Sequence, residues 1–221
     1  MYKIKKASLS PHLLELRNVC LTLNKSQMFS KLNIKVSAGE GVTIMGPSGC
    51  GKSSLLAFIC GTLPDAFQAS GDVFLNGNSL EGMAPETRQV GILFQDDMLF
   101  PHMSVGQNLF FGLTSQIKGK HERNKRINQA LDESGLPGIA DRMPETLSGG
   151  QRSRVALMRT LLSEPKALLL DEPFSQLDSD LRDQFREFVF SHLQKYKIPT
   201  LLVTHDHIDA EAAGGPVIKL I

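Results

Sequence analysis

The strongest constraint on the fold is the run GPSGCGKS, which spans Gly46 to Ser53 and follows the apolar stretch VTIM. Glycines let consecutive backbone N–H groups curl around phosphate oxygens, and a helix that starts there points its positive end at the anion. The run matches G-x-x-x-x-G-K-[ST], a pattern in which Lys52 reaches the β- and γ-phosphates and the Ser53 hydroxyl ligates Mg²⁺. It predicts a strand, a tight turn and a helix from about Lys52 to Cys60. The predicted nucleotide-binding residues are Gly46, Pro47, Ser48, Gly49, Cys50, Gly51, Lys52, Ser53 and Ser54.

The hydrophobic pattern on either side of this loop predicts an α/β fold. Alternation of apolar and polar residues predicts antiparallel strands at Leu14–Leu23 and Leu32–Val36, and a further strand with a turn lies at Gly71–Gly77. Mainly apolar runs predict buried strands of a parallel sheet. These runs are Val42–Met45, Ala167–Asp171 and Thr200–His205.

Helical patterns predominate in the middle of the chain. VGQNLFFGL and NKRINQALDESG both have helical spacing, and Gly135 and Pro137 end the second. Apolar residues at Leu181, Phe185, Phe188 and Leu193 predict another helix between the last two buried strands. We expect one domain over residues 1–221, with a helical insertion at about residues 98–160.

Composition excludes several classes of function. The 24 basic and 23 acidic residues leave a net charge of +1, which gives no support for direct nucleic-acid binding. The three cysteines lack metal-ligand spacing and are expected to be free thiols in a reducing cytosol. The opening residues MYKIKKASLSPHLLEL lack the apolar run of a secretory signal, and no segment has the ~20 apolar residues needed to cross a bilayer. Any membrane path would therefore be built by another chain.

Two carboxylates, Asp171 and Glu172, follow the apolar run ALLL. Sites in parallel sheets form at the carboxyl ends of strands, so both are expected to face the phosphate loop, Asp171 to hold Mg²⁺ and Glu172 to polarise the attacking water. The alternative is a pair of solvated acids at a strand end. Gln95 and His205 end two other strands and are either hydrogen-bonded caps or groups that contact water, metal and γ-phosphate.

The segment LSGGQRSRVALMRTLL, from Leu147 to Leu162, opens a helix with Ser-Gly-Gly. Unpaired N–H groups and a hydroxyl at a helix start form a second anion site, although Ser148 could equally be a simple N-cap. Two anion sites and one nucleotide are most simply explained if the second site serves the nucleotide held by another copy.

Taken together, these motifs resemble the complete set found in ATP-binding subunits of ABC transporters, in the same order and over nearly the whole chain. The resemblance implies a P-loop NTPase fold with a RecA-like α/β core, an antiparallel β subdomain and a helical insertion. The motifs are GPSGCGKSS, FQ at Phe94–Gln95, LSGGQ at Leu147–Gln151, LLLDEP at Leu168–Pro173, SQLD at Ser175–Asp178 and TH at Thr204–His205.

The resemblance also implies roles for individual residues. Two copies would pack head to tail as a homodimer around ATP and Mg²⁺, with Asp178 as a cross-dimer contact. Glu172 would be the catalytic base, and His205 would contact the γ-phosphate. Gln95 would link the nucleotide to the membrane partner. The metal ligands would be Ser53, Gln95 and Asp171. The residues that cover the partner's ATP would be Leu147, Ser148, Gly149, Gly150 and Gln151.

The stretch FQDDMLFPHMSVGQNLFFGL is similar to that of bacterial importer ATPases of the iron, thiamine and polyamine type. We therefore expect import, with a separate integral membrane permease, a substrate-binding protein, and a position on the cytoplasmic face of the inner membrane. An ATPase of an efflux or lipoprotein-release permease is an alternative. So is an ATPase acting on nucleic acid or ribosomes, although the chain has a single phosphate loop and no coiled coil. An inactive scaffold is disfavoured by the intact Lys52, Asp171 and Glu172.

Three positions depart from the family pattern. Leu23 occupies the place where an aromatic residue usually stacks on adenine, and Phe29 is the nearest aromatic residue along the chain. Gln176 stands where smaller residues are commoner. The sequence ends at Ile221, soon after the strand of His205, so we expect it to lack the C-terminal regulatory domain of many sugar and polyamine importer ATPases.

Overall fold

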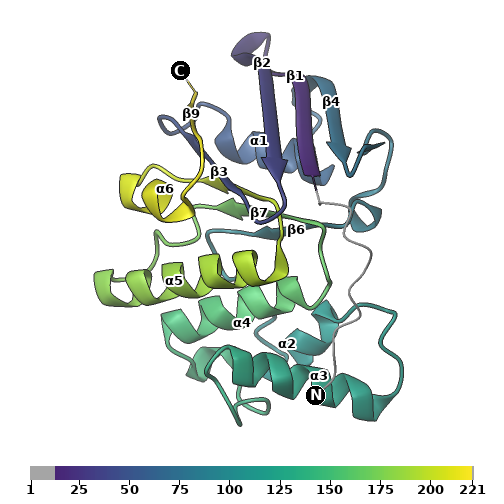
Figure 1. The fold of residues 1–221 in the computed structure, drawn as a ribbon, viewed down its shortest axis with the longest axis vertical. Helices are drawn as coiled ribbons and strands as arrows, with labels where there is room; N and C mark the ends of the chain where they lie inside the picture. The colour runs from purple at the N-terminus through teal and green to yellow at the C-terminus, as the bar shows by residue number, and fades with distance from the viewer. Residues whose placement is uncertain (1–12, 221) are drawn as a thin grey trace.

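Two sheets organise the structure, a computed structural model that describes residues 13–220 (Figure 1). The antiparallel sheet has the strand order β2-β1-β4-β5, and the parallel sheet has the order β6-β7-β8-β3-β9. The predicted mixed α/β architecture is thus confirmed. The antiparallel strands are β1 (Leu13–Leu23), β2 (Ser26–Ser37), β4 (Phe67–Leu75) and β5 (Asn78–Ser79). The parallel strands are β3 (Gly41–Met45), β6 (Val90–Leu93), β7 (Ala167–Asp171), β8 (Thr200–Val203) and β9 (Val217–Lys219).

Helices cover the parallel sheet on both faces. They are α1 (Lys52–Cys60), α2 (Val105–Gly112), α3 (Lys120–Glu133), α4 (Gly149–Leu161), α5 (Ser179–Tyr196) and α6 (His207–Ala213), with short 3₁₀ turns at Pro85–Thr87 and Pro144–Thr146. Within residues 13–220, no helix combines the length and the apolar character that crossing a bilayer requires.

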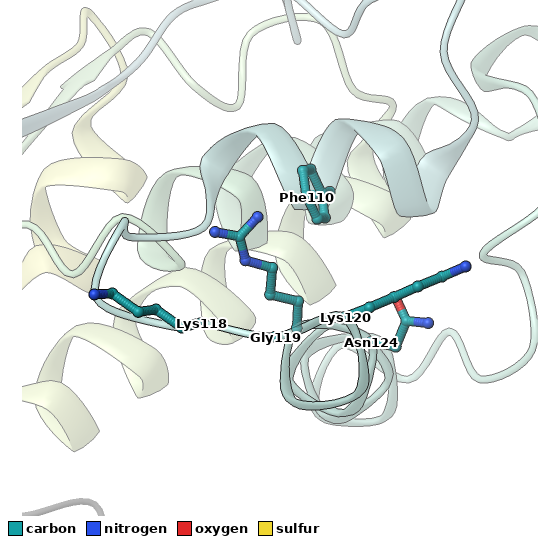
Figure 2. A pocket seen from close by; sticks show the side chains of 6 residues that line it. Phe110, Lys118, Gly119, Lys120 and Asn124 are labelled. Carbon is teal, nitrogen blue, oxygen red and sulfur yellow. The ribbon is translucent and has the colours of Figure 1, made fainter.

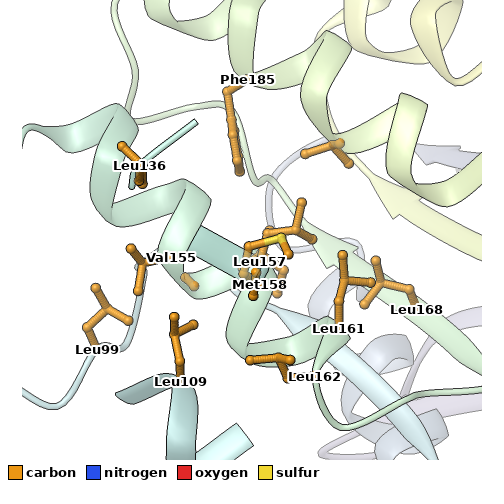
Figure 3. Packing of buried hydrophobic residues seen from close by; sticks show 14 of the residues in the cluster. Leu99, Leu109, Leu136, Val155, Leu157, Met158, Leu161, Leu162, Leu168 and Phe185 are labelled. Carbon is orange, nitrogen blue, oxygen red and sulfur yellow. The ribbon is translucent and has the colours of Figure 1, made fainter. Parts of the chain in front are cut away.

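The burial of strand β7 on both faces explains why its sequence does not alternate between apolar and polar residues. Leu168 and Leu170 pack into a core shared with α2, α3, α4 and α5, part of which is drawn in Figure 3. Ala167 and Leu169 point to the other face, into a core shared with α1 and the antiparallel sheet. Because both faces are covered, the strand is apolar at every position before Asp171. The same division places α1 and α4 on opposite faces of the parallel sheet (Figure 1).

Most predicted elements are confirmed, and α1 has the predicted bounds. The strand predicted at Thr200–His205 was too long, because β8 ends at Val203, two residues before His205. Asp206 caps α6 there, so the chain must leave the sheet. The β1–β2 layer is longer than predicted, because Asn24 and Lys25 form a two-residue turn with positive φ values of 49° and 66° that continues the pairing.

The predicted bounds of the domain and its insertion stay predictions. Helices α2, α3 and α4 all lie between Val105 and Leu161, which agrees in position with an insertion at about 98–160. The prediction that the first residues carry no secretory signal falls largely on residues 1–12, outside the described part of the chain.

Candidate nucleotide site

The strand order brings the predicted site residues to one edge of the parallel sheet. The phosphate loop follows β3, and its neighbour β8 is followed by His205. Next in the sheet, β7 ends at Asp171, and β6 is followed by Gln95. All these strands are parallel, so their carboxyl ends share one edge, which is where α/β sheets form ligand sites.

The phosphate loop is shaped by close backbone contacts. A Cβ on Gly46 would lie 2.8 Å from the carbonyl oxygen of Leu220, so only glycine fits. Gly51 has a φ of 98° and directly precedes α1, a conformation that glycine adopts without strain. The Lys52 ammonium is buried and lies across the loop, where it donates to the carbonyl oxygens of Gly46 (2.8 Å) and Pro47 (2.9 Å). A positive charge is therefore held against the backbone of the phosphate loop.

Ser53 and Asp171, two of the predicted metal ligands, meet in the candidate site. The Ser53 hydroxyl, in the first turn of α1, donates to Oδ1 of Asp171 at 3.0 Å. Burial raises the pKa of Asp171, and this hydrogen bond opposes the rise. Among residues 13–220, no group of three or more His, Cys, Asp or Glu side chains could hold a metal by itself. Mg²⁺ bound to nucleotides usually takes only one or two protein oxygens, so this hydroxyl and carboxylate fit it.

Glu172 lies beside His205. Its Oε2 is 3.2 Å from Nδ1 of His205, and the side chains are 24% and 67% exposed, so solvent reaches both groups. Glu172 has a φ of 45°, which is sparsely populated for a residue with a Cβ, and its N–H donates to the carbonyl of Val203 at 2.9 Å. This left-handed conformation turns the backbone at Glu172 away from the direction of β7. Backbone strain of this kind is common where a side chain has to be aimed.

The segment after β6 is tied to two other parts of the chain. Gln95 is exposed, and Oδ1 of the next residue, Asp96, accepts a hydrogen bond from Nε2 of Gln176 at 2.6 Å. Asp97 pairs with Arg152 on α4 at 2.9 Å. Sequence reasoning missed both links and treated Gln176 only as an unusual residue. The paired acids after Gln95 were the available signal, but nothing in the sequence shows which groups they meet.

Ser148 lies at the start of α4, which packs on the opposite face of the parallel sheet from α1. It is the N-cap of α4, where its Oγ accepts from the N–H of Gln151 at 3.3 Å, and Oε1 of Gln151 accepts from the N–H of Ser148 at 3.1 Å. Ser104 makes the same pair of bonds at the start of α2. Asp178 likewise caps α5, with Oδ1 3.4 Å from the N–H of Leu181. Within one chain, then, Ser148 and Asp178 act as helix caps, and their roles across a dimer stay predictions.

The surroundings of Leu23 differ from what the sequence suggested. Phe29 is only 7% exposed and packs against the phosphate loop, where its Cε1 would lie 3.1 Å from a Cβ on Gly51. Its ring is therefore part of the core. Leu23 pairs across β1 and β4 with Phe67, which is partly exposed, and paired residues in antiparallel strands share a face. Phe67 on β4 thus offers an aromatic surface beside Leu23. The sequence alone could not show that β4 pairs with β1 at this position.

The cysteines are free thiols, as expected. Cys50 is half-buried within the phosphate loop. Burial raises the pKa of the Cys60 thiol on α1 to about 11, which makes it a poor nucleophile at neutral pH.

A cavity away from the sheet edge lies between α2 and the start of α3, with a volume of about 510 Å³. Figure 2 shows that the Lys118 and Lys120 side chains point in opposite directions. Arg123 lies over the Phe110 ring, 5.0 Å from its centroid, and donates to the carbonyl of Ile117 at 2.8 Å. These cations do not converge on one point, so the cavity is not a built anion site, and none of the predicted nucleotide-binding residues lines it.

Comparison with known proteins decides the family. A family model described as ABC transporter matches residues 29–175, which include the phosphate loop, Asp171 and Glu172. The chain belongs to the ABC transporter family. It is an ATP-binding subunit of that family, whose members couple ATP hydrolysis to transport. The prediction from the motif set is confirmed.

Individual relatives are similar over most of this ABC transporter subunit. An uncharacterized ABC transporter ATP-binding protein of Escherichia coli, YnjD, is 50% identical over 196 residues, which is 89% of this chain and 90% of the relative. The Fe(3+) ions import ATP-binding protein of Mannheimia succiniciproducens is 41% identical over 94% of this chain and 58% of the relative. The spermidine/putrescine import ATP-binding protein of Pseudomonas aeruginosa is 42% identical over 92% of this chain and 55% of the relative. The chain thus spans a little over half the length of these two import proteins.

Proposed function

We propose that the chain is the ATPase subunit of an importer. It works as a homodimer on the cytoplasmic face of the inner membrane. There it drives a separate permease, which receives its substrate from a substrate-binding protein. The observation that carries the proposal is the meeting of Lys52, the Ser53–Asp171 pair and the Glu172–His205 pair at one sheet edge. Similarity to iron, polyamine and maltose import proteins supports import over export.

In this proposal each residue at the edge has one task. The Lys52 ammonium exchanges its bonds to loop carbonyls for the β- and γ-phosphates. Ser53, Asp171 and Gln95 hold Mg²⁺, which when bound neutralises phosphate charge. Glu172 accepts the proton of the attacking water, and His205, next to it, donates to the γ-phosphate. A carboxylate beside an imidazole at the end of a strand is suited to that division of work.

The proposed dimer completes the site with the start of α4 from the partner. In one chain, α1 and α4 cover opposite faces of the sheet, which makes it hard for Ser148 to reach its own phosphate loop (Figure 1). A head-to-tail pair would bring Ser148, Gly150 and the N–H groups at the start of α4 over the partner's γ-phosphate. Asp178 would contact the partner beside them.

Ser148→Arg is expected to abolish ATP-dependent dimerisation, because a long cation cannot fit where the γ-phosphate of the partner has to approach. Size-exclusion chromatography with light scattering, in a Glu172→Gln background that preserves ATP, measures the dimer fraction. Ser104→Arg is a matched control, since it breaks the same capping box on α2 outside the proposed seam and costs a similar ~1 kcal/mol of helix stability. Equal dimer fractions in the two variants would refute the sandwich.

Exposed apolar side chains near α2 support docking to a permease. Phe111 is 66% exposed and Met98 is 59% exposed, and Phe94 and Phe110 are each 45% exposed. A surface rich in large apolar groups is typical of a protein interface.

Phe111→Ser is therefore expected to weaken association with the permease while ATP turnover of the free subunit is retained. Co-purification of the tagged chain with membrane proteins from its native cells measures the association. The matched control is Val217→Ser, which removes a 45%-exposed side chain from edge strand β9. Recovery of nucleic acid or ribosomes in place of a membrane protein would contradict the transport assignment in these cells.

A further inference from the structure

A buried ion pair lies behind the turn that carries His205. Arg186 on α5 donates through Nε and Nη2 to Oδ1 of Asp209 on α6, at 2.9 and 2.7 Å. The two residues are 6% and 3% exposed. Although burial alone lowers the pKa of Arg186, the carboxylates of Asp209 and Asp183 raise it, so the guanidinium is firmly charged.

The second oxygen of Asp209 holds the turn directly. Its Oδ2 accepts a hydrogen bond from the hydroxyl of Thr204 at 2.9 Å, and Thr204 is 2% exposed. The same hydroxyl accepts from the N–H of Asp206 at 3.0 Å. The bonds therefore fix the residue before His205 and the residue after it, while the His205 side chain itself is largely exposed.

This network also joins the turn to the helix that begins at the proposed dimer seam. Asp178 caps α5, and Arg186 lies eight positions further on, about 12 Å along the helix. Between them, Arg182 donates to the carbonyl of Leu177 at 2.9 Å and lies 3.5 Å from the carboxylate of Asp206. Helix α5 therefore reaches the His205 turn directly through Arg182 and indirectly through Arg186 and Asp209.

A buried ion pair is weak evidence for stability, because the cost of removing two charges from water offsets their attraction. A pair that only joined α5 to α6 would have no need of Thr204. Here the carboxylate divides its oxygens between the arginine and the turn. This division favours orientation of the turn over simple packing.

We propose that Arg186, Asp209 and Thr204 are positioning residues that fix the turn of His205 and so set its imidazole beside Glu172. The proposal rests on the γ-phosphate contact proposed above for His205. It adds three buried residues that act on His205 through the backbone of its turn.

Thr204→Val removes the hydroxyl with almost no change of shape, and Thr204→Ser keeps it. We expect Thr204→Val to lower kcat about tenfold or more with little change in the KM for ATP, because a small displacement of an aligned group is costly in the transition state. Thr204→Ser should retain most of the turnover. Asp209→Asn should behave like Thr204→Val, and Asp209→Glu should restore part of the activity.

Loss of stability is separated from loss of positioning by two controls. Val189→Ala creates a cavity in the buried face of α5 outside the network, and its kcat should stay at the wild-type level even though its melting temperature falls. In a His205→Ala background, Thr204→Val should change kcat by less than about twofold, because the group that it positions is absent.

The outcomes separate the role proposed for His205 from the role proposed for Arg186, Asp209 and Thr204. If His205→Ala hydrolyses ATP at the normal rate, the proposed role of His205 is wrong. If His205→Ala is impaired but Thr204→Val and Asp209→Asn keep normal kcat, or add their full loss to that of His205→Ala, the positioning proposal alone is overturned. The same holds if Val189→Ala lowers kcat in proportion to its loss of stability.

Discussion

Glu172→Gln is expected to bind ATP with unchanged affinity and to lose turnover by about 10²- to 10⁴-fold, the range typical of losing a general base. The amide has nearly the same shape as the carboxylate but cannot accept the proton of the attacking water. The amide oxygen can keep the contact with Nδ1 of His205, which lies 3.2 Å from Oε2 in the wild type. The site should therefore stay assembled, and the variant should accumulate as an ATP-bound dimer.

Phosphate release under single-turnover and steady-state conditions measures this effect, and equilibrium binding measures the affinity. Glu187→Gln is the matched control, since it neutralises an exposed carboxylate on α5. Turnover by Glu172→Gln at the rate of this control would show that another group is the base. Loss of ATP binding would instead show that Glu172 helps to hold the nucleotide.

Lys52→Ala is expected to weaken ATP binding by about 10- to 100-fold, because each hydrogen bond to a charged group contributes roughly 1.5–3 kcal/mol. The ammonium is buried inside the loop, so no mobile cation can easily take its place. It also donates to Gly46 and Pro47, and these carbonyls would lose a donor. Part of the loss would therefore come from a less ordered loop.

Isothermal calorimetry with a non-hydrolysable ATP analogue measures the loss. Lys35→Ala removes an exposed lysine from β2 and controls for the change in net charge. A thermal melt monitored by circular dichroism shows whether the loop change spreads to the fold. Wild-type affinity in Lys52→Ala would refute the assignment of the loop as the phosphate site.

Much of the fold was predictable because the strongest signals are local. The bounds of α1 and β7 were predicted correctly, since a glycine-rich turn and an apolar run that ends in an aspartate are both visible in the local sequence. The C-terminal end of β8 and the length of β2 were not, because they depend on Asp206 capping α6 and on Asn24 and Lys25 adopting positive φ. Such choices are made by neighbouring elements and not by hydrophobic periodicity.

The candidate site likewise has features that the sequence predicts and features that it does not. The sequence by itself determined which groups the candidate site contains: a glycine-rich loop with its lysine, two acids after a buried strand, and a Ser-Gly-Gly helix start. Each is a short pattern with a direct physical meaning. It also determined the family, since the motifs occur in one order along the chain.

Only the tertiary structure decided which of these groups meet. The bond from Ser53 to Asp171 joins residues 118 positions apart, and it exists because β3 and β7 flank β8 in the sheet. The partnership of Gln176 with Asp96 and the network of Arg186, Asp209 and Thr204 arise in the same manner. Strand order and helix packing set these distances. Neither leaves a periodic trace in the sequence, because each is the outcome of burying all the apolar faces at once.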